Sequence, residues 1–232
     1  MKKLKIALVA GLMMACTSPA LGLEVSGDVY VSVFSDYIWR GFDLTGEDNF
    51  VIQPGADVSV GSFTVSWWGN FSENTGEMNE VDLTLDYRLD INDRIAVSFG
   101  NILYDIDGAT DTHEIYAGLG VNALLSPSLF LYYDYDEFDG NIFAVLSIGH
   151  SFDVTDSLGL NFGAAASYLN DDDIKERWLH NAELSAGVDF AATDQITISA
   201  RALYSTPLSD AAEDFAEIDD EFTAGLTVAL AF

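Results

Sequence analysis

The chain has 232 residues, of which 49% are hydrophobic and 12% aromatic, and it carries 38 acidic residues against nine basic ones. The acidic excess excludes a nucleic-acid-binding protein, because it repels phosphate backbones. The apolar and aromatic content excludes a disordered acidic tail, since such tails lack the residues that build a core.

Residues 1–22 have the pattern of a secretory signal peptide. Three lysines precede a short apolar stretch, and small residues follow it. Ala20 and Gly22 would occupy the minus-three and minus-one positions of a cut before Leu23. An alternative is that the residues before Cys16 form a loose lipobox, so that a lipidated Cys16 becomes the mature N-terminus. The apolar stretch is too short to span a bilayer as a helix.

Removal of this leader would leave residues 23–232 as one domain with six basic and 38 acidic residues, a net charge of −32. Such a charge favours cations or surfaces bridged by cations. The only cysteine lies in the leader. The mature domain is therefore predicted to have no disulfide and no thiolate-bound cofactor, and we expect no cofactor at all.

Alternation of apolar and polar side chains recurs along the mature chain in stretches of nine to fifteen residues, separated by turn-forming residues. Strands of globular proteins usually have about five or six residues, whereas tilted strands of about nine to eleven cross a bilayer. The pattern predicts an all-β fold with twelve strands. They cover residues 25–39, 50–60, 63–71, 79–89, 94–104, 113–125, 128–136, 141–152, 158–169, 178–190, 195–204 and 220–232.

The connections between these strands alternate between short turns and longer acidic loops. This asymmetry and the even strand number are typical of an antiparallel transmembrane β-barrel in the bacterial outer membrane, with both termini in the periplasm. A water-soluble sandwich would have shorter strands. The predicted periplasmic turns are 61–62, 90–93, 126–127, 153–157 and 191–194, and the predicted outer loops are 40–49, 72–78, 105–112, 137–140, 170–177 and 205–219.

One set of alternate positions is apolar and should face lipid, with aromatic residues where the lipid headgroups begin. The apolar set includes Val29, Val31, Val33, Leu83, Leu85, Ile115 and Leu119. The outer aromatic belt would contain Tyr37, Trp39, Trp67, Phe71, Tyr87, Tyr133, Tyr135, Tyr168, Trp178 and Tyr204, and the inner belt Phe63, Phe152, Phe190 and Phe232.

The opposite set of positions carries charges that hydrocarbon cannot receive, so these side chains should line the lumen. Ten of these fourteen charges are acidic, which predicts a narrow water-filled channel that favours cations. The alternative is a plugged lumen in which Arg88 and Arg94 neutralise Asp57, Asp82 and Asp86. The predicted pore-lining residues are Asp28, Asp36, Arg40, Asp57, Asp82, Asp86, Arg88, Arg94, Glu114, Asp134, Glu183, Asp189, Arg201 and Glu221.

The acidic outer loops are the candidates for metal binding and for partners. Residues 105–108 match part of the sequence pattern of a calcium-binding loop. The full pattern with its terminal glutamate is absent, so no metal site is predicted. We expect the loops to contact outer-membrane lipid and lipopolysaccharide, with divalent cations as bridges. We expect Phe232 to act as the assembly signal of the C-terminal strand toward the barrel-assembly machinery.

An enzymatic site would need a general base, and the chain has three histidines. His113, His150 and His180 all fall on the predicted lipid-facing positions near strand ends, and residues 111 and 115 beside His113 are aspartate and isoleucine. Asn101 on the neighbouring strand matches a catalytic site only in part. No catalytic residue is predicted, and a lipid-modifying enzyme is the least favoured alternative.

Residues 34–42 read Phe-Ser-Asp-Tyr-Ile-Trp-Arg-Gly-Phe, with Gln-Pro-Gly at 53–55. This opening resembles the TorF family of porin-like proteins, whose first strand carries a similar run, and the length and leader agree with it. The resemblance suggests a pair between Asp36 and Arg40 at the outer rim, with Gly41 releasing the chain into the first loop. Together these observations predict a passive diffusion channel for small hydrophilic solutes; a structural or adhesion barrel is the alternative.

Overall fold

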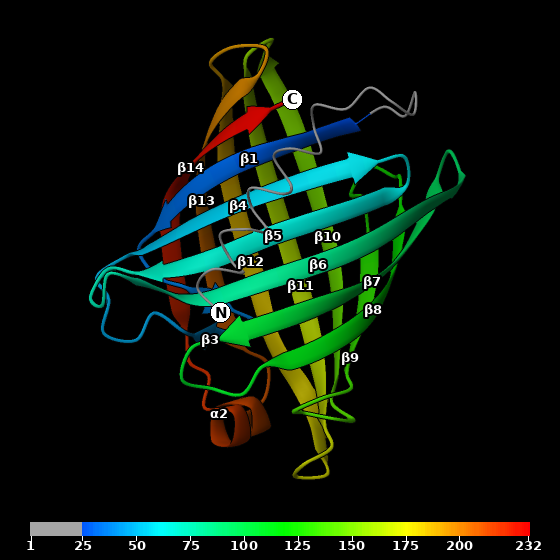
Figure 1. The fold of residues 1–232 in the computed structure, drawn as a ribbon. Coiled ribbons are helices and arrows are strands. Elements are labelled where there is room, and N and C mark those ends of the chain that lie inside the picture. The colour runs from blue at the N-terminus through cyan, green and yellow to red at the C-terminus, as the bar shows by residue number, and fades with distance from the viewer. Residues whose placement is uncertain (1–24) are drawn as a thin grey trace.

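A computed structural model describes residues 25–232; the predicted signal peptide and its cleavage site lie outside the described residues. Twelve strands form a closed antiparallel barrel, in which neighbours in the chain are neighbours in the ring and β1 pairs with β14 (Figure 1). Among residues 25–232, no helix is long and apolar enough to cross a membrane. The barrel strands are β1 (Val25–Phe34), β4 (Val51–Val60), β5 (Phe63–Ser72), β6 (Glu77–Asn92), β7 (Ile95–Ile106), β8 (Thr112–Val121), β9 (Ser128–Asp134), β10 (Ile142–Thr155), β11 (Leu158–Asp171), β12 (Glu176–Ala191), β13 (Ile196–Pro207) and β14 (Glu221–Ala231).

The predicted fold class and all twelve predicted strands are confirmed. The largest difference is at the first strand, which ends at Phe34 instead of residue 39. The chain then forms a small hairpin from β2 (Ile38–Trp39) and β3 (Phe42–Asp43). A second difference is a short helix in the last outer loop, α2 (Asp210–Ala216), which Ser209 caps by accepting a hydrogen bond from the backbone N–H of Ala212.

Side chains alternate between the two faces of the barrel wall as the sequence predicts. Val31, Leu85 and Leu226 point outward and are 47%, 51% and 59% exposed, whereas Ser32 and Thr223 point inward and are buried. Closure pairs the backbone of every strand with two neighbours and leaves no open edge, which is the condition for a sheet to cross hydrocarbon. The apolar outer surface therefore matches a bilayer.

The two ends of the barrel differ in the length of their connections. The longer loops and α2 gather at one end, and the chain ends at the other (Figure 1). The prediction that Tyr87 belongs to the outer aromatic belt was wrong. Tyr87 pairs with Phe63 across β5 and β6, with ring centroids 4.7 Å apart, and so lies near the inner end. The reason is the length of β6, which has 16 residues and continues well past this pair.

A β-bulge in β12 changes which side chains face the lumen. The pairing of β11 and β12 shifts between Ala166 and Tyr168, so that one extra residue of β12 lies opposite β11. As a result His180 and Asn181 are both buried in succession, while Leu179 is 56% exposed. Trp178 is only 5% exposed. The predictions that His180 and Trp178 face lipid were therefore wrong, because they assumed uninterrupted alternation.

Candidate functional site: a lumen crossed by residues 35–49

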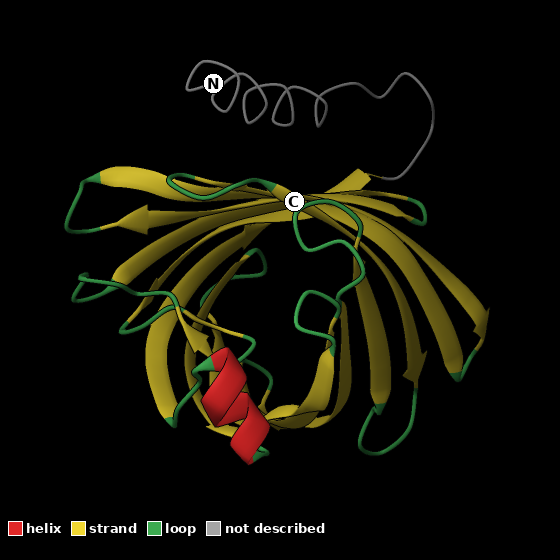
Figure 2. Ribbon diagram, turned by 90° about the horizontal axis from the view of Figure 1, so that it is seen from below, coloured by secondary structure: helices red, strands yellow, loops and turns green. Residues whose placement is uncertain are grey.

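Residues 35–49, here called the crossing segment, leave the wall at the end of β1 and run through the lumen. The backbone N–H of Asp36 donates to Thr223 of β14, and the ring of Tyr37 lies 5.4 Å from Trp68 of β5. Arg40 reaches Glu114 of β8, which stands nearly opposite β1 in the ring order. The crossing segment therefore spans the outer half of the lumen. This is the end of the barrel that carries α2 and faces the viewer in Figure 2.

Arg40 and Glu114 form a two-pronged ion pair inside the barrel. Nη1 and Nη2 of Arg40 donate to Oε1 and Oε2 of Glu114, both at 2.7 Å. The hydroxyl of Tyr104 donates to Oε2 of the same carboxylate at 2.8 Å. The side chains of Arg40 and Glu114 are only 15% and 7% exposed. Parallel N–H···O bonds between a guanidinium and a carboxylate combine charge with fixed orientation, which makes this pair a strong anchor.

Three aromatic rings enclose the guanidinium of Arg40. Its Cζ lies 4.4 Å from the ring centroid of Trp39, 4.7 Å from Tyr132 and 4.4 Å from Phe143. Trp39 belongs to the crossing segment, whereas the other two rings belong to β9 and β10. A cation over the face of an aromatic ring is attracted by the ring quadrupole, most strongly where water is excluded. Arg40 thus joins the crossing segment to the far wall by charge and by ring contacts.

The backbone at Arg40 is held by a buried histidine. The phi angles of Arg40 and Gly41 are +54° and +88°, so the chain turns sharply at the ion pair. The indole N–H of Trp178 donates to Nδ1 of His180 at 3.0 Å, so Nδ1 is an acceptor and the proton sits on Nε2. Nε2 lies 2.9 Å from the carbonyl oxygen of Arg40 and donates to it. His180 therefore fixes the turn that aims the guanidinium.

The last outer loop packs onto this arrangement. Trp178, Ala212 and Ile218 form a buried cluster, and Phe42 of the crossing segment packs against it. The ring of Phe42 is also 5.4 Å from His180. Helix α2 thus packs, through this cluster, against the part of the crossing segment that contains Phe42 (Figure 1).

The structure corrects three predictions for these residues. The suggested rim pair of Asp36 with Arg40 was wrong, because Arg40 binds Glu114 instead. Tyr37 and Trp39 were predicted to face lipid, but Tyr37 is 8% exposed and Trp39 lies against Arg40 and Tyr104 within the lumen. The common reason is that β1 ends at Phe34, after which alternation no longer determines the face.

Within residues 25–232, the alternative network of Arg88 and Arg94 with Asp57, Asp82 and Asp86 is also not formed. Arg88 pairs with the nearby Asp90 at 3.1 Å, and both side chains are exposed. Asp86 instead accepts a hydrogen bond from the hydroxyl of Tyr116. Arg88 and Arg94 both line a cavity of about 600 Å³ at the periplasmic end, together with Asp90, Asn92 and Asn122.

The remaining predicted pore-lining residues take up several positions on the inward face. Asp28 and Asp57 are cross-strand partners on β1 and β4. Asp189 pairs with Arg201 at 2.8 Å and also accepts from Ser199. Glu183 accepts from the buried Asn181. Asp82 lies on β6 opposite Trp68, and Glu221 begins β14 at the outer end.

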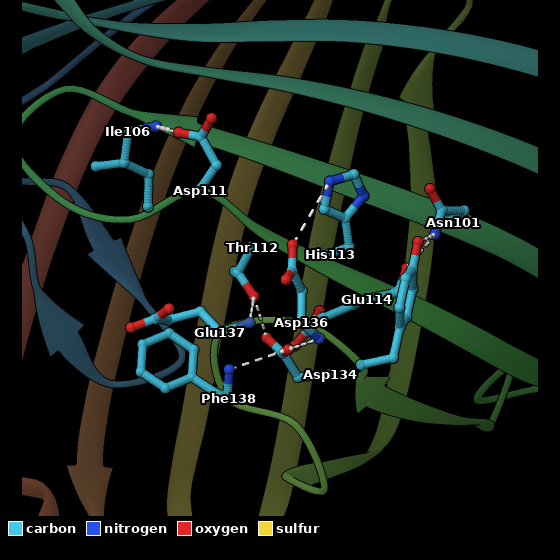
Figure 3. Close-up of polar contacts among 11 residues, drawn as sticks. Asn101, Ile106, Asp111, Thr112, His113, Glu114, Asp134, Asp136, Glu137 and Phe138 are labelled. Carbon is cyan, nitrogen blue, oxygen red and sulfur yellow. Dashed lines mark hydrogen bonds and ion pairs between the residues drawn. The ribbon is translucent and has the colours of Figure 1, made fainter.

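Asp134 has a local structural task at the end of β9. It is 4% exposed and accepts hydrogen bonds from Thr112 and from the backbone N–H groups of Asp136 and Phe138 (Figure 3). These bonds hold the short loop that leads to β10. Asp134 and Tyr132 share the inward side of β9. The carboxylate of Asp134 is nevertheless engaged in hydrogen bonds to the loop.

The histidine considered as a general base lies on the outer face. Nε2 of His113 is 3.9 Å from a carboxylate oxygen of Asp136 (Figure 3). The centroid of its ring is 5.7 Å from that of Tyr135. Asn101 donates to the hydroxyl of Tyr135. Thr112, the hydroxyl residue next in sequence, is buried with Asp134 on the other side of the strand. This geometry does not present Thr112 to His113 as a nucleophile. Among residues 25–232, no group of three or more acidic, histidine or cysteine side chains is arranged to hold a metal ion.

Comparisons with known proteins agree with the fold. The chain is similar to the KdgM porin, with a TM-score of 0.59 and 10% identity over 89% of this chain and 99% of that one. It is similar to the NanC porin, with a TM-score of 0.57 and 13% identity over 88% and 98%. No family model and no curated protein matches the sequence. At this identity the comparisons show the fold of an outer-membrane β-barrel, and the resemblance to the TorF family stays a prediction.

Proposed function

We propose that this chain forms a passive diffusion channel for small hydrophilic solutes in the bacterial outer membrane. The observation that carries the proposal is the opposite character of the two barrel faces, with an apolar exterior and a lumen lined by charged and hydroxyl side chains. An apolar lining would repel water, whereas this lining can hydrate a solute path. The fold shared with the KdgM and NanC porins supports the same function.

The acidic lumen should favour cations. Three of the four predicted lumen arginines, Arg40, Arg88 and Arg201, are bound to carboxylates and so contribute little free positive charge. The facing aspartates Asp28 and Asp57 carry like charge toward the path. A permeating cation would be attracted by this field, and an anion would be repelled.

The crossing segment sets the size of solute that the channel admits. It occupies the outer half of the lumen, whereas the periplasmic end holds the cavity lined by Arg88 and Arg94. A solute entering from outside must pass between the crossing segment and the wall before it reaches the periplasmic end. We therefore propose small, hydrated solutes rather than large ones.

Purified protein in planar bilayers tests the proposal. We expect discrete conductance steps, and a potassium chloride gradient should give a reversal potential of the sign for cation preference. The variant D28N/D57N should lower that preference, because it removes two facing charges from the lumen. The variant D173N, on an exposed loop, is the matched control and should leave it unchanged. Absence of discrete steps at every salt concentration would refute the channel.

A structural barrel is the second candidate, and the crossing segment is the observation that favours it. A lumen tightly filled by this segment would admit no solute. The acidic outer loops could then bind lipopolysaccharide through divalent cations, and the C-terminal strand could engage the assembly machinery. Lack of conductance, together with loss of envelope integrity on deletion, would favour this function over the channel.

A further inference from the structure

We propose that the lumen wall carries a binding site for solutes with an alkylguanidinium group, formed by Glu114, Tyr104, Tyr132 and Phe143. In this structure the side chain of Arg40, which is covalently attached to the chain, occupies the site. These four wall residues are here called the guanidinium cage. The inference rests on the proposed function, because it names the solute class that the channel would select.

All four residues of the guanidinium cage belong to the barrel wall and not to the crossing segment. Its residues lie on four consecutive strands, β7 to β10, which pair in register. Tyr104 holds one oxygen of Glu114, and the rings of Tyr132 and Phe143 lie 6.5 Å apart. Removal of the Arg40 side chain therefore leaves a carboxylate and two ring faces in place.

The geometry of this cage suits a guanidinium better than a spherical cation. Both carboxylate oxygens of Glu114 are 2.7 Å from separate nitrogens of Arg40, which requires a planar fork of donors. Two wall rings lie within 4.7 Å of the central carbon, and a flat, weakly hydrated cation gains most from such contacts. Potassium offers neither a fork of donors nor a flat face.

The covalent attachment of Arg40 to the chain explains how solutes could pass through a channel that contains such a site. A covalently attached competitor acts at a high effective concentration, so a free solute binds only weakly while Arg40 is present. A channel needs sites that are favourable enough to enter and weak enough to leave. Arg40 would keep the cage weak for solutes, and a solute guanidinium would replace it for the time of its passage.

The experiment compares block of the potassium current by ethylguanidinium chloride in wild type and in R40G. Glycine suits the phi angle of +54° at this position, and R40A serves as a second variant if R40G fails to fold. We expect half-block of R40G at a concentration at least tenfold lower than of wild type, and loss of the block in R40G/E114Q. The variant K175G is the matched control, since Lys175 also has a positive phi angle, of +60°, and pairs with Asp172 on an exposed outer loop. It should behave as wild type.

Each result has one meaning. If R40G conducts potassium but ethylguanidinium does not block it, the inference is wrong and the channel stands. If R40G is blocked but wild type is insensitive at every concentration, the cage is only a socket for Arg40, and the inference is again wrong. If no variant conducts, the proposed function fails. Thermal unfolding in detergent then tests the site alone: millimolar ethylguanidinium should raise the Tm of R40G and not that of R40G/E114Q, and no rise would overturn the site.

Discussion

Replacing Glu114 by alanine should lower the free energy of unfolding by about 3 kcal/mol, because it leaves a buried guanidinium without its anion. The side chains of Arg40 and Glu114 are 15% and 7% exposed, so water replaces the lost partner poorly. Tyr104 would also lose its acceptor. Urea unfolding of the protein in lipid vesicles measures the change.

The exposed pair of Arg88 and Asp90 supplies the control for this prediction. Its side chains are 60% and 70% exposed, and removal of such a pair costs no more than about 1 kcal/mol. Asp90→Ala should therefore be nearly neutral. The same Glu114→Ala variant should show larger and noisier conductance, since the crossing segment loses its anchor. Equal stability of Glu114→Ala and Asp90→Ala would contradict the position of Arg40 described above.

Arginine in place of Leu83 should destabilise the barrel by about 2 to 4 kcal/mol, because it puts a charge at the lipid-facing middle of a strand. Leu83 lies in β6 opposite Trp67 and Leu103, on the same face as the exposed Leu85. Unfolding into urea from lipid vesicles measures the difference from wild type.

Thr84→Arg is the matched variant on the other face of β6. Thr84 follows Leu83 in the chain and lies between Asp82 and Asp86 on the inward side, so an arginine there would meet carboxylates. The loss should be far smaller than for Leu83→Arg. If both variants lost the same stability, the assignment of the two faces would be refuted.

The strands could be predicted because apolar and polar side chains alternate with a two-residue period in each of twelve segments, which cover nearly the whole mature chain. Each strand needs only local alternation and a turn, both visible in the sequence. The prediction fails where alternation is interrupted: β1 ends at Phe34 although Tyr37 and Trp39 continue its pattern, and the bulge in β12 buries His180. Neither interruption has a local signal as clear as a glycine or proline turn.

The site was predicted only in part, because its contacts join distant parts of the chain. Arg40 and Glu114 were both placed in the lumen by their position in the alternation, but 74 residues separate them. No local pattern chooses Glu114 among ten predicted lumen carboxylates. Tyr132 and Phe143 share the inward face with Glu114, so a search for aromatic side chains at inward positions could have found them.

Single cysteines along β14, labelled with a water-soluble maleimide in lipid vesicles, test the central claim that one face of the wall meets hydrocarbon and the other meets water. The only native cysteine, Cys16, lies in the predicted leader, so the mature barrel offers a clean background. Cysteine at Thr227 or Ala229 should react, and cysteine at Leu226 or Val228 should stay protected. Reaction at Leu226 and Val228 with protection at Thr227 and Ala229, or equal reaction at all four, would contradict the account.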